Sequence, residues 1–119
     1  MSLTARHLEE NGLSTVIMGS ARDIVEECGV PRFVFTDFPL GNPCGKPGDV
    51  KMQKDITGIG LDLLERAWMP RSTIQTPFYW DHEEWRNDFM RVDDNNRAAL
   101  ALEGEKRRQF QAEMKKRKD

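Results

Sequence analysis

The sequence predicts an α/β fold, with a small parallel sheet built on a βαβ unit and a C-terminal helical extension. Two short apolar runs, 15–18 and 33–35, have the unbroken hydrophobicity of strands that are covered on both faces. A helical pattern lies between them, and a strand, a helix and a second strand in this order form a βαβ unit with parallel strands. After residue 70 the chain turns polar and rich in helix-forming residues, which predicts a helical extension.

Turn and cap residues set the predicted bounds of the first elements. Residues 3–11 form a short helical pattern that Gly12 closes. The first strand breaks at Gly19, and Ser20 is expected to cap the following helix. That helix ends at Gly29, after which the chain enters the second strand.

A loop and a long helix follow the second strand. Three glycines and two prolines within 40–49 exclude a helix or a central strand there. Asp49 is a good N-cap for the next helix, which Pro70 stops. Small and apolar residues recur in it at helical spacing: Ile56, Ile59, Gly60, Leu63, Leu64 and Ala67.

The expected organisation is an α/β domain over 1–70, a Rossmann-like fragment, and a mostly helical extension over 71–119. The sequence does not decide whether residues 73–76 form a third strand. The extension carries few large apolar side chains, so we expect it to contact a partner. Two or three strands leave their edges unpaired, and we expect another chain, in a homo-oligomer or hetero-oligomer, to complete the sheet.

Composition excludes several classes of protein. The 119 residues are 38% hydrophobic and 32% charged, which suits one folded domain. No apolar run is long enough to span a membrane, and no secretory signal pattern opens the chain. Two cysteines are too few for a disulfide scaffold. We therefore expect a cytoplasmic protein. From Glu103 onward the chain has seven basic and four acidic residues. No aromatic residues alternate with the basic ones, so nucleic acid is not an expected partner.

The two predicted catalytic residues are Cys44 and Asp37. Cys44 lies in a Gly/Pro loop after an apolar strand, where α/β sheets place ligands, and Lys46 nearby would favour its thiolate. An unreactive loop cysteine is the alternative. Asp37 ends the second strand and suits either a base or an ordinary turn residue. Cys28 is expected in the core.

Gly19, Ser20 and Arg22 form a candidate anion site, with Lys46 as a further ligand residue. They follow a strand and open a helix, so free N–H groups, the helix dipole and the guanidinium could hold a carboxylate or phosphate. An ordinary N-cap is the alternative. No metal or cofactor is expected, because the histidines and cysteines lack ligand spacing. Since the loop 40–49 and the Gly19-Ser20 turn both follow parallel strands, we expect one shared cleft.

The segments 5–18, 30–32 and 38–43 resemble the glycine/sarcosine/betaine and D-proline reductase selenoproteins of the component B type. The resemblance covers about residues 3 to 67. It implies reductive cleavage of a carbon–nitrogen bond by a selenol or thiol nucleophile, with a thiol system as electron source. The family's nucleophile motif stands upstream of the first helix and has no counterpart in this sequence.

The resemblance implies a subunit or half-domain of such a reductase, with a small-carboxylate cleft and a nucleophile from another chain. Whether the chain takes part in catalysis is left open, and we expect it to be inactive alone. The alternative is a non-catalytic α/β module that binds a small molecule or serves assembly.

Overall fold

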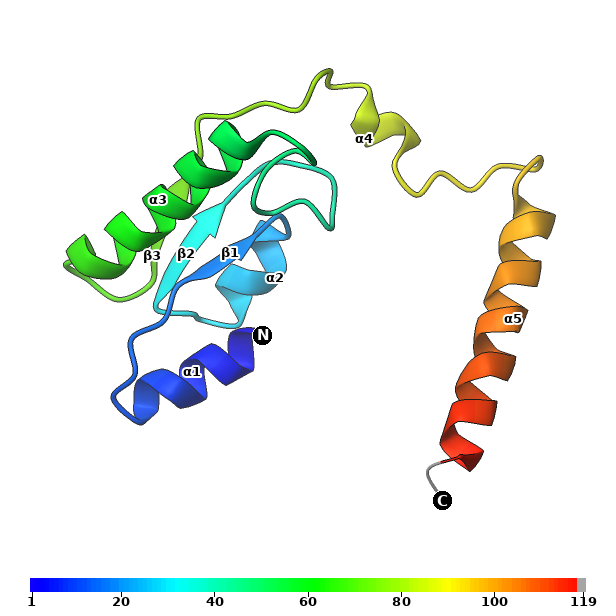
Figure 1. Ribbon diagram of the computed structural model, residues 1–119, viewed down its shortest axis with the longest axis horizontal. Helices are drawn as coiled ribbons and strands as arrows, with labels where there is room; N and C mark the ends of the chain where they lie inside the picture. The colour runs from blue at the N-terminus through cyan, green and yellow to red at the C-terminus, as the bar shows by residue number, and fades with distance from the viewer. Residues whose placement is uncertain (118–119) are drawn as a thin grey trace. The chain divides into compact units, whose positions relative to one another are not determined.

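The computed structural model describes residues 1–117 (Figure 1). Its elements are α1 (Ser2–Glu10), β1 (Ile17–Gly19), α2 (Arg22–Glu27), β2 (Arg32–Phe35), α3 (Val50–Arg66), β3 (Ser72–Gln75), α4 (Trp85–Asp88) and α5 (Arg97–Lys116). The chain divides into two compact units: Met1–Arg86, which holds the sheet, and a second unit that begins at Asn87.

The three strands form one parallel sheet in the order β1-β2-β3. In the register, Gly19 pairs with Phe35, and Phe35 pairs with Gln75. The central strand β2 is the most buried, with Phe33 and Val34 at most 1% exposed. The α/β class and the small parallel sheet are confirmed, and β3 is the third strand that the sequence left open.

Helices cover both faces of this sheet. On one face α3 approaches closely at Gly60, where a Cβ atom would lie 3.4 Å from the Met18 sulfur. On the other face a Cβ at Gly19 would lie 3.8 Å from a methyl group of Val25 in α2. Gly58, by contrast, faces open space, so close packing explains only one of the two glycines of α3.

The long helix α3 forms as its sequence pattern predicts. The Asp49 carboxylate accepts a hydrogen bond of 3.0 Å from the Met52 N–H, which confirms the expected N-cap. Ile56, Gly60 and Leu63 face inward at helical spacing. The buried apolar side chains of the whole core are Ala5, Val30, Phe33, Val34, Phe38, Ile56 and Leu63.

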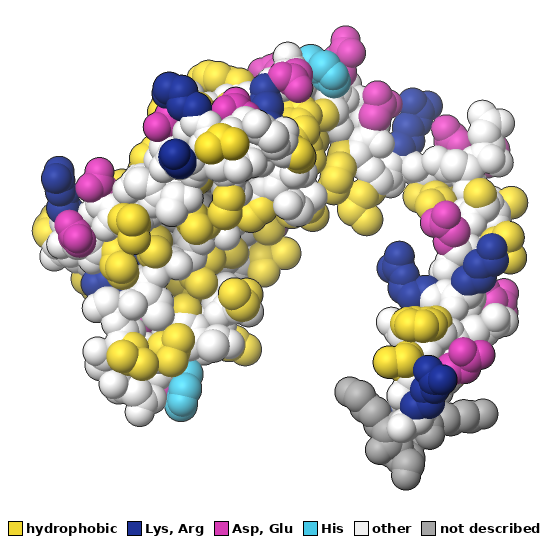
Figure 2. Space-filling model, in the orientation of Figure 1, with side chains coloured by type: hydrophobic (Ala, Val, Ile, Leu, Met, Phe, Trp, Pro, Cys, Tyr) yellow, Lys and Arg dark blue, Asp and Glu magenta, His cyan; other side chains and the backbone are white. Residues whose placement is uncertain are grey.

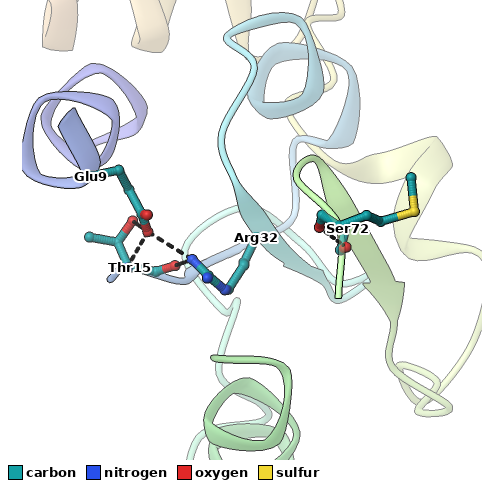
Figure 3. Close-up of polar contacts among 5 residues, drawn as sticks. Glu9, Thr15, Arg32 and Ser72 are labelled. Atoms are coloured by element: carbon teal, nitrogen blue, oxygen red, sulfur yellow. Dashed lines mark hydrogen bonds and ion pairs between the residues drawn. The ribbon is translucent and has the colours of Figure 1, made fainter. Parts of the chain in front are cut away.

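Two predicted bounds were wrong. The N-cap of α2 is Ala21 and makes no side-chain cap bond, so Ser20 does not cap this helix. The first strand begins at Ile17, because the N–H and hydroxyl of Thr15 both bond the Glu9 carboxylate instead of a neighbouring strand (Figure 3). Arg32 donates to the same carboxylate at 2.9 Å, and thus ties α1 to the start of β2.

The second unit contains the predicted C-terminal helix, α5. It spans 20 residues, and Figure 2 shows hydrophobic and basic side chains beside each other on it. Its large apolar residues stay 41% exposed or more: Leu100, Leu102, Phe110 and Met114. Among residues 1–117, no helix combines the length and hydrophobicity that a membrane crossing requires.

Candidate site at the carboxyl edge of the sheet

The carboxyl edge is the end of the sheet where β1, β2 and β3 finish. Because the strands are parallel and in register, the residues that follow them lie in one row: Ser20, Thr36 and Thr76. The Thr36 N–H donates to the Gly19 carbonyl at 3.0 Å, which holds the turn after β1 beside the exit of β2. The Gly19-Ser20 turn and the residues after β2 thus share an edge, as expected.

The hydroxyl row was missed from the sequence. Thr36 is fully buried and Thr76 is 4% exposed, and the Thr76 hydroxyl donates to that of Thr36 at 3.2 Å. The Ser20 hydroxyl oxygen is buried and has no hydrogen-bond partner within residues 1–117. Buried hydroxyls normally find a partner, so Ser20 has unused hydrogen-bonding capacity at this edge. The only sequence signal was that each residue directly follows a strand.

Asp37 leaves β2 and forms an ion pair with Arg86. One guanidinium nitrogen donates to its carboxylate at 3.0 Å, and a second donates to the other oxygen. The hydrogen bond to Asp37 raises the pKa of Arg86 above its ordinary value. Arg86 also lies over the ring of Trp85, 4.7 Å from its centroid. To act as a base, Asp37 would first have to release this bidentate partner.

Lys46 is likewise engaged. Its ammonium pairs with Asp81 and lies 5.9 Å from the ring centroid of Trp80. Trp80 in turn packs edge-on against the buried Phe38, with centroids 5.1 Å apart. The Lys46 carbonyl accepts a hydrogen bond of 2.7 Å from Gln53, which ties the loop to α3. The charge of Lys46 is therefore directed at Asp81.

Packing accounts for the structural roles of Gly19 and Arg22. A Cβ at Gly19 would lie 3.1 Å from the Phe33 ring, so a glycine fits this position. Arg22 pairs with Glu26 at 3.1 Å and lies 5.6 Å from the centroid of Phe35. Its side chain remains half exposed, and thus open to a further partner.

Both cysteines are free and half-buried. Cys44 lies in the loop between β2 and α3, as expected. Cys28 is the C-cap residue of α2 and lies outside the core, contrary to expectation; its carbonyl accepts a hydrogen bond from Arg6. No group of three or more metal-ligating side chains occurs in the part of the chain that the structure describes.

The opposite, amino-terminal edge of the sheet has its own polar cluster. The Glu9 carboxylate lies between Thr15 and Arg32, and Ser72 donates to the Met69 carbonyl at 2.6 Å (Figure 3). A cavity of about 360 Å³ adjoins Glu9 and Arg32. The Glu9–Arg32 pair joins the end of α1 to the start of β2, whereas the Ser72–Met69 bond closes the turn that leads into β3.

The three-stranded parallel sheet with its helices places this chain in the α/β class. A stretch of 76 residues is 35% identical to the D-proline reductase subunit gamma of Acetoanaerobium sticklandii and covers 64% of this chain. The chain spans about a third (31%) of the length of that relative. No family model and no solved structure matches the chain. The similarity supports a relation to the proline reductase family.

Proposed function

We propose that this chain is a subunit of a glycine/betaine/proline reductase-like assembly. It contributes a cleft for a small carboxylate, and another chain contributes the redox-active cysteine or selenocysteine. The observation that carries this proposal is the similarity to D-proline reductase subunit gamma. The name of that relative says that it works as one subunit among others, which supports partner chains here as well.

The proposed cleft lies at the carboxyl edge. The backbone of Gly19, the unpartnered hydroxyl of Ser20 and the cations of Arg22 and Lys46 would bind the carboxylate. Cys44, in the loop between β2 and α3, would border this cleft. Free cysteines suit the reducing cytoplasm in which this chemistry would take place.

The reaction class is reductive cleavage of a carbon–nitrogen bond. A selenol or thiol of the partner attacks the carbon, and the bond to nitrogen breaks. The nitrogen takes up the proton of the nucleophile. One thiol then attacks the carbon-bound sulfur or selenium, so that its bond to carbon breaks and a C–H bond forms. A second thiol frees the nucleophile, and the two thiols, which supply two electrons and two protons in all, end as a disulfide. This chain's own contribution is to hold the carboxylate and orient the carbon for attack.

Purification of the tagged full chain from its native host tests the proposal. We expect mass spectrometry to find a second polypeptide with a cysteine or selenocysteine motif. We also expect the complex, supplied with a dithiol, to open the ring of D-proline to a linear amino acid with a new primary amine, and the chain alone to leave D-proline unchanged. Recovery of the chain without any partner, from cells that reduce D-proline, would contradict the assignment.

A specific observation favours the alternative, a non-catalytic binding or assembly module. Asp37 and Lys46 are both held in ion pairs, which suits structural residues better than a poised base and ligand. Cys44→Ser in the purified complex separates the two. Loss of activity with the assembly intact supports a role for Cys44 in the cleft, whereas full activity favours the module.

A further inference from the structure

The amino-terminal edge of the sheet holds a charged pair beside the cavity of about 360 Å³. Arg32 opens β2, and Glu9 lies in the last turn of α1 (Figure 3). Apolar residues form the rest of the lining: Pro31, Ala67, Trp68, Met69 and Pro70. A mostly apolar cavity with a few convergent polar groups is the usual form of a small-molecule site.

The position of this cavity follows from the packing of α3. Arg32 and Val34 lie on the same face of β2, because side chains alternate along a strand. α3 covers this face, since a Cβ at Gly60 would lie 4.0 Å from a methyl group of Val34. The turn 67–70 after α3 then lines the cavity beside Arg32. All of these residues belong to the unit Met1–Arg86, so the cavity forms within one compact unit.

Both partners of the charged pair keep hydrogen-bonding capacity. The three hydrogen bonds described for the Glu9 carboxylate, two from Thr15 and one from Arg32, all go to Oε1. The two bonds that the Arg32 guanidinium donates, to Glu9 and to the Thr15 carbonyl, both come from Nη1. Its Nε is buried and has no partner within residues 1–117. Native proteins rarely leave a buried N–H unpaired, so this side of the guanidinium suits a further acceptor.

The available atoms of the pair have opposite charge and lie beside each other, which matches a zwitterion. Oε2 of Glu9 is an acceptor for an ammonium group, and the Nε–Nη2 side of Arg32 is a bidentate donor for a carboxylate. An α-amino acid carries both groups on one carbon, and the 2.9 Å hydrogen bond holds Glu9 and Arg32 at a similarly short separation. The two side chains are only 22% and 19% exposed, so charges there are screened less than at an open surface.

We propose that this cavity binds a free α-amino acid with an apolar side chain. Arg32 holds its carboxylate, Glu9 holds its ammonium group, and its side chain packs on Trp68 and Met69. These two apolar residues are 88% and 48% exposed, so a ligand there removes apolar surface from water. The site lies at the opposite edge of the sheet from the proposed carboxylate cleft and does not depend on it.

Ligand requirements distinguish this site from the alternatives. The Glu9–Arg32 pair also joins α1 to β2, and a purely structural pair would bind no ligand. The proposed cleft at the carboxyl edge uses cations alone, so it needs only the negative charge of a ligand. A zwitterion site needs both charges, and it is therefore recognised by the loss of binding when either one is removed.

Isothermal titration of the full-length protein with L-leucine, L-phenylalanine and D-proline tests the proposal. We expect at least one of them to bind with a Kd between about 1 μM and 1 mM, the range open to a ligand of few atoms. The amide and the N-acetyl derivative of the amino acid that binds each lack one charge. Each should bind about tenfold more weakly or worse, since each loses a charge-assisted hydrogen bond.

Two variants with matched controls locate the site. Glu9→Gln keeps an oxygen for Thr15 but removes the charge, and should weaken binding about tenfold. Glu10→Gln removes the same charge from the next, exposed residue and should leave affinity unchanged. Trp68→Ala tests the cavity without touching the ion pair and should weaken binding severalfold. Tyr79→Ala, which removes an aromatic ring that is 82% exposed and outside this cavity, should have no effect.

Three outcomes would overturn the inference. Absence of binding by the wild type with all three amino acids would leave the charged pair a structural role only. Equal affinities of the free amino acid and its N-acetyl derivative would show a site that reads the carboxylate alone, as the proposed cleft does. Binding that survives both Glu9→Gln and Trp68→Ala would place the ligand elsewhere on the chain. The proposed function stands in each case, because it rests on the similarity to D-proline reductase subunit gamma.

Discussion

At the scale of single residues, Gly58 and Gly60 show how position decides what a glycine does. Gly60 faces the sheet, and a side chain there would contact Met18. Gly58 lies on the same helix but, apart from its chain neighbours and the backbone of α3 itself, no atom lies within 4 Å of its Cβ position. Gly60 therefore allows α3 to pack closely on the sheet, whereas Gly58 only weakens the helix.

Gly58→Ala should therefore stabilise the protein by about 0.5–1 kcal/mol, the difference in helix propensity between the two residues. Urea unfolding followed by circular dichroism measures it. Gly48→Ala is the matched control, because its φ of +81° is unfavourable for alanine and the change should destabilise. A loss of stability in Gly58→Ala would show that a further chain packs on this side of α3.

The N-cap of α3 supports a second prediction. Asp49→Ala removes the acceptor of the Met52 N–H and should cost about 1 kcal/mol of the free energy of unfolding. Asp49→Asn keeps a capping oxygen and should recover most of that loss. The urea midpoints of the three proteins give the comparison, and equal midpoints would mean that the cap contributes nothing.

Single residues also show where sequence reasoning reached its limit at the site. The positions of Asp37 and Lys46 after β2 could be predicted, since a strand end is visible in the hydrophobic pattern. Their partners stand 49 and 35 residues further along the chain, in a segment without periodicity. Contacts at that separation depend on how β3 joins the sheet, and no local spacing encodes them.

At the scale of elements, strong patterns were reliable and short ones were not. The sequence of α3 has an N-cap residue, apolar residues at helical spacing and a proline after its end, and all three predict the same helix. β1 has only three residues, and its start depends on Glu9 capturing Thr15 across a turn. The third strand is polar and half exposed, so hydrophobicity alone could not establish it.

The two compact units give a prediction at this scale. A chain truncated after Arg86 keeps the sheet, the helices α1, α2 and α3, and the ion pairs of Lys46 and Arg86. We expect cooperative unfolding at nearly the same urea midpoint as the full chain, because the strands and the buried apolar side chains all belong to the unit Met1–Arg86. Loss of cooperativity on truncation would mean that the sheet unit needs residues after Arg86 in order to fold.

At the scale of the whole molecule, a three-stranded parallel sheet leaves apolar surface without cover. Trp68 and Tyr79 are more than 80% exposed, and Ile74 on the edge strand β3 is 41% exposed. A groove of about 480 Å³ runs between the end of α3 and β3. Exposed apolar patches and unpaired strand edges favour association.

We therefore expect the purified chain to associate at micromolar concentration. Parallel sheets are normally covered on both faces and extended by further strands, and here β1 and β3 are both edges. Light scattering should report a mass above the 13.8 kDa of one chain, and Ile74→Lys should lower it by placing a charge on the edge. Trp68→Lys probes the adjoining groove, while Lys54→Gln, on the outer side of α3, should leave the mass unchanged. A cooperative monomer of 13.8 kDa would show that the strand edges are stable in water and that the proposed assembly is not needed for folding.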